Sequence, residues 1–218
     1  MMTKTVTLFF STTLLLLIPT FARAQATTDT AVDKQQTSEG IQKRSNEFGV
    51  WGSISFDATT WIGYTPDARF GNIGLRYGRV LAASKSVAFE WTIDAIPVAV
   101  LSNSRVTFAP SFQSTRKSVY AWGISPIGLK FNFRRNKRVQ PFGASTGGFL
   151  YFNEQVPVAG AARFNFTFDF QGGVQIVNSN QRSFMIGYKY NHISNGYHAP
   201  INPGVDVQMV FFGFSIFK

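Results

Sequence analysis

From Glu47 onward, apolar and polar residues alternate with a period of two through most of the chain. Successive residues of a β-strand point to opposite faces of a sheet, so this alternation predicts strands with one apolar and one polar face. The clearest strand has four phenylalanines on one face, namely Phe164, Phe166, Phe168 and Phe170. Its other face carries Arg163, Asn165, Thr167, Asp169 and Gln171. Such a strand suits contact with lipid or a packed core on one side, and water or a polar lumen on the other.

Turns rich in Gly, Asn, Ser or charged residues divide the pattern into eight strands. We expect them at about residues 47–56, 70–80, 87–94, 119–133, 139–152, 163–171, 183–192 and 206–217, with residues 97–117 part strand and part loop. Single-chain bacterial outer-membrane barrels have an even number of strands, and a closed barrel leaves no open edge toward hydrocarbon. The sequence therefore predicts an all-β fold, an eight-stranded antiparallel transmembrane β-barrel.

Composition agrees with this fold class. Phe occurs 23 times and Gly 19 times, and Phe and Gly in alternation, with charge confined to turns, are typical of a membrane barrel. No run of about 18 apolar residues, which would predict a transmembrane helix, follows the first 24 residues. A soluble lipocalin-like barrel with the phenylalanines inside is an alternative that the same pattern leaves open.

The N-terminal region predicts export. Lys4 precedes an apolar stretch, and Ala22-Arg23-Ala24 supplies small residues for cleavage, so we expect residues 1–24 to be a secretory signal peptide. Residues 25–45 are polar and are expected to form a flexible N-terminal segment, followed by the barrel over residues 46–218. The chain has no cysteine, so its stability depends on packing and backbone pairing.

The chain is basic, with 21 Lys and Arg against 11 Asp and Glu, and Lys4 and Arg23 leave with the expected signal peptide. Export argues against a nucleic-acid partner, and anionic lipid or lipopolysaccharide of the outer membrane fits the charge better. Ordinary solubilising charge, as in the basic turn at residues 134–138, is a simpler explanation for most of these residues.

The lengths of the connections orient the predicted barrel. Those after the second, fourth and sixth strands are short, and those after the first, third, fifth and seventh are longer. Outer-membrane barrels have short periplasmic turns and longer external loops. With the N-terminus in the periplasm, the end of the seventh strand lies at the cell-surface rim.

Candidate chemistry lies at that end. His192 and Ser194 share the face of the apolar residues of their strand, which we expect to face lipid because the opposite face carries Lys189. Asp206 falls on the outward face of the eighth strand, so it can approach His192 across the hairpin. Ser194 could then attack, His192 take its proton, and Asp206 orient the imidazole. From spacing alone, a loop-end acid at the water interface is the simpler interpretation of Asp206.

The segment His192-Ile193-Ser194-Asn195, followed by Asn202, Pro203, Gly204 and the acid Asp206, resembles the outer-membrane lipid A 3-O-deacylases. The resemblance implies an eight-stranded barrel whose serine hydrolase site lies on its outer surface and removes an ester-linked acyl chain from lipid A. It implies that Ser194 is the nucleophile, His192 the base and Asp206 the acidic member. Asn195 and Asn202 match positions that organise the site or its oxyanion hole. The motif covers residues 192–206, and the rest is similar only in architecture.

The chain departs from this family at Asp206, where family members carry glutamate. Because aspartate is one methylene shorter, the relay requires a closer approach of the strand or an intervening water. We expect Ser194 to lie within hydrogen-bond reach of His192, and His192 within reach of Asp206, at about 2.6–3.2 Å. The other histidine, His198, is expected to be a loop or headgroup-contact residue rather than a second base.

The sequence thus predicts an outer-membrane serine esterase that hydrolyses an ester-linked acyl chain of lipid A. There is no Gly-x-Ser-x-Gly elbow to indicate an α/β-hydrolase, and no ligand cluster to indicate a metal, so no cofactor is expected. The alternative is a non-catalytic small barrel with a structural or adhesive role, in which the motif is only a hairpin loop. The acyl position that is cut, activity on phospholipids and the presence of a homodimer are left open.

Overall fold

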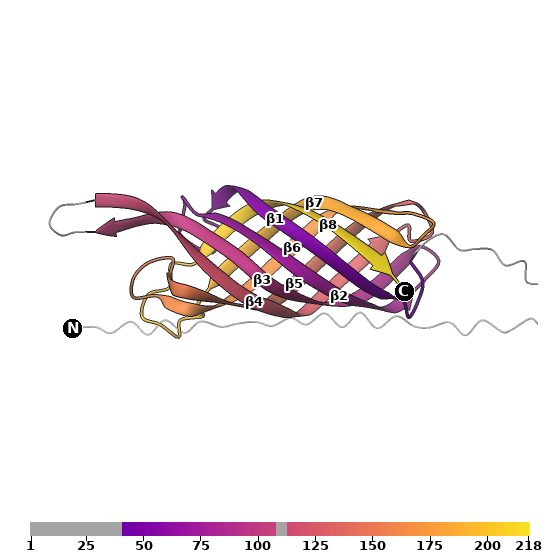
Figure 1. The fold of residues 1–218 in the computed structure, drawn as a ribbon, viewed down its shortest axis with the longest axis horizontal. Coiled ribbons are helices and arrows are strands. Elements are labelled where there is room, and N and C mark those ends of the chain that lie inside the picture. Colours follow the sequence, from indigo (N-terminus) through magenta and orange to yellow (C-terminus); the bar gives the residue numbers. More distant parts are fainter. Residues whose placement is uncertain (1–40, 108–112) are drawn as a thin grey trace, which may run out of the picture. The chain divides into compact units, whose positions relative to one another are not determined.

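The computed structural model describes residues 41–107 and 113–218, which form a closed antiparallel barrel (Figure 1). Its strands are β1 (Asn46–Thr59), β2 (Arg69–Ala83), β3 (Val87–Thr107), β4 (Gln113–Phe133), β5 (Val139–Val156), β6 (Ala162–Val177), β7 (Arg182–Ser194) and β8 (Val205–Phe217). Each strand pairs with the next, and β1 pairs with β8 to close the barrel. The predicted fold class is confirmed. Within the described residues, no helix has the length and apolar character needed to cross a bilayer.

The N-terminal segment is described only from residue 41. The signal peptide expected at residues 1–24, and residues 25–40 of the segment expected to be flexible, lie outside the described residues. Residues 41–45 pack against the barrel, because Ile41 is fully buried in a small apolar cluster that also contains Val80, Ala88, Val177 and Phe217. The Ile41 N–H donates to the Arg135 carbonyl at 3.3 Å. The end of this segment is therefore ordered.

All eight strands are longer than the sequence pattern predicts, and the largest difference is in the β3–β4 hairpin. The β3–β4 ladder continues through Ser102↔Ser118 to Thr107↔Gln113, across the region expected to be part loop. Polar residues occupy both faces of β3 there, so the period-two signal fades although the backbone pairing continues. In Figure 1 the β3–β4 hairpin projects beyond the other strands. Strand β7 is also longer and includes Ser194 as its last residue.

The outer face of the barrel is apolar. Large exposed side chains occur on every strand, among them Val50, Leu75, Val98, Ile127, Tyr151, Phe166, Phe170, Phe184, Phe212 and Phe214. Charged residues Glu90, Asp94 and Lys130 on the alternate positions are fully or almost fully buried inside. A water-soluble barrel would reverse this arrangement, because an apolar surface of this extent cannot face water. The lipocalin-like alternative is wrong.

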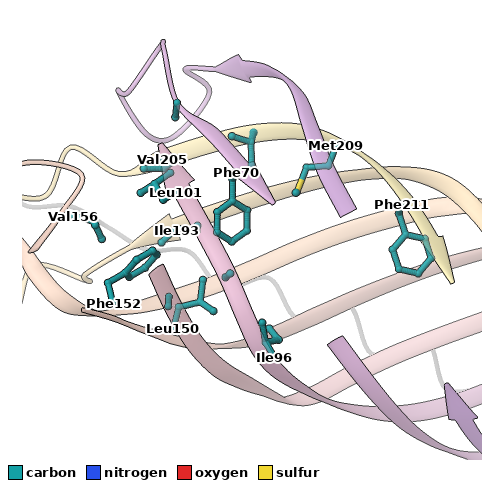
Figure 2. Close-up of a cluster of buried hydrophobic side chains, with 14 of the residues drawn as sticks. Phe70, Ile96, Leu101, Leu150, Phe152, Val156, Ile193, Val205, Met209 and Phe211 are labelled. Atoms are coloured by element: carbon teal, nitrogen blue, oxygen red, sulfur yellow. The ribbon is translucent and has the colours of Figure 1, made fainter. Parts of the chain in front are cut away.

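The interior changes character along the barrel. We call the end with connections 60–68 and 195–204 the loop end, and the opposite end, with connections 84–86 and 178–181, the turn end. A large apolar cluster, including Phe70, Leu101, Ile193 and Val205, fills the interior toward the loop end (Figure 2). A polar layer lies between this cluster and the turn end, so the lumen is not polar throughout.

Lys130 is the central cation of that polar layer. Its Nζ donates to both Glu47 carboxylate oxygens, at 3.1 and 2.9 Å, and lies 3.4 Å from Glu90 Oε2. All three side chains are fully buried. A second buried pair, Arg76 with Asp94, joins β2 and β3 at 2.7 Å. Together these pairs tie β1, β2, β3 and β4 together through the lumen.

Lys130→Met is expected to destabilise the barrel by about 3–5 kcal/mol, because it leaves Glu47 and Glu90 buried without their cation. The measurement is the urea midpoint of unfolding in detergent micelles or vesicles. Lys137→Met, in the exposed turn between β4 and β5, is the matched control and should leave the midpoint unchanged. Equal midpoints for both variants would show that the buried cation does not stabilise this fold.

Candidate active site

His192 and Asp206 are direct cross-strand partners at the loop end of β7 and β8. The histidine Nδ1 lies 2.5 Å from Asp206 Oδ1. Asp206 is fully buried and His192 is 6% exposed. The shorter aspartate therefore reaches the imidazole by direct contact, because antiparallel pairing already brings the two backbones together.

Two backbone N–H groups also hold the Asp206 carboxylate. Ile62 and Gly63 donate to its Oδ2 at 2.6 and 2.9 Å. With His192 this gives the buried acid three hydrogen-bonded partners, which offset the cost of removing it from water. Since the carboxylate accepts, the proton of the neutral imidazole is assigned to Nδ1 and the lone pair to Nε2. That tautomer is the one a general base needs.

The first loop reaches the site because β1 closes the barrel against β8. Their ladder runs to Thr59↔Asp206, so connection 60–68 begins beside the acid. The Tyr64 N–H then donates to the Pro203 carbonyl at 2.6 Å. The sequence pattern did not point to this loop, although a predicted closed barrel makes the loops after its first and seventh strands neighbours.

Glycines allow the two loops to meet. A Cβ on Gly63 would lie 2.6 Å from the Gly204 carbonyl carbon, which is closer than such atoms approach. Gly204 has a positive φ of 68°, and a Cβ there would lie 3.3 Å from His192 Cε1. The Gly204 position in the motif is thus explained by contact with both the first loop and the imidazole.

Gly63→Ala is expected to push connection 60–68 away from Gly204 and withdraw the two N–H donors from Asp206. Misplacement of a supporting group by about 1 Å can cost on the order of a hundredfold in rate. We therefore expect a roughly 10- to 100-fold loss in the rate of the lipid A deacylation that the sequence resemblance implies. The rate is measured with purified protein in detergent. Gly143→Ala is the control, because nothing lies within 4 Å of a Cβ there. Full activity of Gly63→Ala would contradict the supporting role of this loop.

Ser194 lies on the same outward face as His192, opposite Phe166 of β6, and is half-buried. In the described part of the chain, no hydrogen bond joins its hydroxyl to His192. Same-face neighbours on a strand are separated by two rises of about 3.3 Å each, so the side chains must lean together to touch. Catalytic hydrogen bonds often close only when substrate binds, and a change in the Ser194 rotamer would move its hydroxyl relative to His192.

Asn195 and Asn202 shape the connection that follows. The Asn195 side chain, 1% exposed, donates from Nδ2 to the Ile201 carbonyl at 2.8 Å and accepts from the Tyr197 N–H at 2.9 Å. Asn202 Oδ1 accepts the Asn195 N–H at 3.0 Å. These bonds leave one proton on Asn195 Nδ2 and both protons on Asn202 Nδ2 available. The Gly196 N–H also has no partner within the described residues.

Aromatic rings border the histidines. The Phe168 ring centroid lies 5.0 Å from that of His192, and Trp61 stacks on Tyr190 at 4.9 Å. His198 packs against the rings of Phe164 and Phe166 at 5.8 and 6.2 Å. Over residues 41–107 and 113–218, no group of three or more acidic, histidine or cysteine side chains is placed to hold a metal ion. The site consists of a serine, a histidine–acid pair and an apolar border.

The fold is similar to that of solved outer-membrane proteins. The crystal structure of the outer-membrane enzyme PagL superimposes with a TM-score of 0.50 at 13% identity, covering 76% of this chain and 97% of that chain. Neisserial surface protein A (NspA) gives 0.45 at 14% identity, with 78% and 96% covered. OprG from Pseudomonas aeruginosa gives 0.46 at 11% identity, with 83% and 98% covered. A comparison with curated protein sequences finds no match.

The family comparison is more specific than these structural similarities. The family described as lipid A 3-O-deacylase (PagL) matches residues 41–215, which is most of the chain and includes every candidate site residue. The match covers the whole barrel except its last residues, so it does not rest on the short motif alone. The chain belongs to the lipid A 3-O-deacylase (PagL) family.

Proposed function

We propose that this outer-membrane barrel is a serine esterase that hydrolyses an ester-linked acyl chain of lipid A. The observation that carries the proposal is the His192–Asp206 pair, in contact at 2.5 Å, on the outer face beside Ser194. A nucleophile on the outside of a barrel meets lipid rather than a soluble substrate. Family membership supports lipid A as that lipid.

In the proposed reaction, Ser194 Oγ attacks the ester carbonyl carbon while His192 Nε2 accepts the hydroxyl proton. Asp206 stabilises the imidazolium that forms. The tetrahedral intermediate collapses, the sugar oxygen leaves with the proton from His192, and the acyl group stays on Ser194. Water then attacks the acyl-enzyme, again giving its proton to His192. The fatty acid leaves, and Ser194 regains its proton from the imidazolium.

Stabilisation of the negative oxygen in both tetrahedral intermediates is proposed to come from the connection after Ser194. The unused N–H groups of Asn195 Nδ2, Gly196 and Asn202 Nδ2 are candidate donors in that connection. Donors fixed in place before reaction are worth several kcal/mol at a developing oxyanion. Asn195 is held on both sides by loop backbone, which is what such preorganisation requires.

The loop end is proposed to face the cell exterior, where lipid A forms the outer leaflet. This orientation places the turns at residues 84–86, 134–138 and 178–181 in the periplasm. It sets Ser194 at the height of the ester linkages, which lie between the lipid sugar and its hydrocarbon chains.

The direct test is mass spectrometry of lipid A from cells that express the protein and from cells that carry an empty vector. We expect the loss of one ester-linked acyl chain, with amide-linked chains retained. A serine-reactive lipid probe should label the expressed protein in the same membranes. Unchanged lipid A together with no labelling would favour a non-catalytic structural or adhesive barrel.

A further inference from the structure

Two adjoining hollows lie on the outer surface of the barrel around β1 and β2, and the lower one also reaches Phe212 of β8 and Phe184 of β7. The lower hollow, about 560 Å³, is lined almost entirely by apolar groups, including Val50, Ile73, Val98, Phe212 and Phe214. The upper hollow, about 670 Å³, lies at the loop end. Ile54, Gly71 and Val100 line both, so the two form one groove that runs from the rim down the lipid-facing side.

Missing side chains and a split between strands produce the groove. Gly52 and Gly71 occupy outward positions of β1 and β2, where neighbouring outward positions carry large apolar residues. The β1–β2 ladder ends at Ile54↔Gly71, whereas the β1–β8 ladder continues to Thr59↔Asp206. Above Ile54, β1 therefore pairs with β8 alone, and the space between β1 and β2 opens into the upper hollow.

The rim of the groove is polar and carries two cations. Arg69 and Arg116 line the upper hollow together with Asp57 and Asp67. Asp67 is already engaged, because it lies 3.4 Å from Arg116 and accepts the Ser104 N–H at 2.6 Å. Within the described residues, Arg69 makes no ion pair and remains available for an anionic group. An apolar groove below a rim arginine matches a lipid whose chain hangs from a phosphorylated headgroup.

We propose that this groove binds a second acyl chain of the same lipid A molecule whose ester is cleaved at Ser194, with a phosphate of its sugar backbone beside Arg69. The inference rests on the proposed function and adds a second binding site for the same substrate. Three interstrand steps of about 4.8 Å, from β7 through β8 and β1 to β2, separate the β2 side of the groove, at Gly71, from the strand of the nucleophile, or roughly 15 Å. Lipid A carries several chains on a phosphorylated disaccharide and can span that width. A glycerophospholipid, with two chains on one glycerol, cannot.

Strand β1 links the groove to the chemistry. Residues 55–58 of β1 line the upper hollow, and the same end of the strand pairs with β8 as far as Thr59↔Asp206. A chain seated in the groove therefore fixes the sugar relative to His192 and Ser194. Binding energy from a remote part of the substrate is then used to position the scissile ester.

Gly71→Phe tests the proposal because it fills the groove without strain. The nearest atom to a Cβ there is the Ser53 carbonyl oxygen, at 3.5 Å, which is an ordinary contact distance. Two substrates are compared, purified lipid A and a single-chain p-nitrophenyl ester. We expect the ratio of kcat/KM on lipid A to kcat/KM on the single-chain ester to fall at least tenfold. The matched control, Gly143→Phe on the outer face of β5, has open space and should leave the ratio unchanged.

A second arm tests the phosphate contact. Wild type should prefer phosphorylated over dephosphorylated lipid A, and Arg69→Gln should lose that preference. An unchanged ratio in Gly71→Phe, or equal losses on both substrates, would overturn the groove proposal while leaving the esterase intact. If wild type hydrolyses neither substrate, the proposed function itself fails and this inference fails with it.

Discussion

Ser194→Ala is expected to abolish deacylation, lowering kcat/KM on lipid A by about a thousandfold or more. The substitution removes the only oxygen of this side chain and leaves the backbone of β7 in place, so the barrel should fold normally. Mass spectrometry of lipid A should show the full set of acyl chains in cells that express the variant. Purified Ser194→Ala should still bind lipid A, because binding depends on the apolar surface and not on the hydroxyl.

The control for this experiment is Ser118→Ala, an exposed serine on β4 outside the candidate site. It should deacylate lipid A at the wild-type rate. Heat-modifiable migration in gels, a property of folded barrels, confirms that both variants are folded. Equal loss of an acyl chain in wild type and Ser194→Ala would sink the assignment of Ser194 as nucleophile.

Asp206→Asn is expected to lower kcat on lipid A by about 10³- to 10⁴-fold while changing KM little. The amide keeps the shape of the carboxylate but can turn an N–H toward His192 Nδ1, which favours the tautomer with its proton on Nε2. It also removes the negative charge that stabilises the imidazolium. The amide nitrogen cannot accept from Ile62 or Gly63, so at least one of the present bonds to Oδ1 and Oδ2 must change.

Asp206→Glu tests whether the site needs only the negative charge of Asp206 or also the length of its side chain. The longer side chain keeps the charge, but His192 Nδ1 at 2.5 Å and the Ile62 N–H at 2.6 Å leave no room for another methylene. We expect an intermediate loss, smaller than that of Asp206→Asn, because the 60–68 connection can shift outward. Steady-state rates in detergent give the loss of kcat in Asp206→Asn and in Asp206→Glu, and gel migration shows whether each variant is folded. Wild-type kcat in Asp206→Asn would refute the relay.

Alternation along single strands was enough to predict much of this protein. The parity of Phe164, Phe166, Phe168 and Phe170 predicted an apolar outer face, and Phe166 and Phe170 are indeed exposed. The parity of His192 and Asp206 allowed an approach across the last hairpin, although spacing alone favoured a loop-end acid, and the two are cross-strand partners. These predictions succeed because successive side chains of a strand point to opposite faces, so the odd or even position of a residue along the strand is enough to assign its face.

Other features could not be predicted from the sequence because they depend on closure of the barrel. The Ile62 and Gly63 N–H groups reach Asp206 only because β1 pairs with β8, which brings residues far apart in the chain together. Nothing in residues 60–68 marks those amides, since every non-proline residue has one. The extension of β3 and β4 was likewise hidden, because backbone pairing can continue where side-chain polarity no longer alternates.

The sequence by itself determined the fold class, the lipid-facing surface and the face on which Ser194, His192 and Asp206 lie. Tertiary structure alone decided three features: the direct 2.5 Å contact of Asp206 with His192, the hydrogen bonds from connection 60–68 to Asp206, and the groove between β1 and β2. The physical reason is the range of the interactions. A strand's faces follow from neighbouring peptide units, whereas distances across a closed sheet depend on register, bulges and loop contacts summed around the whole barrel.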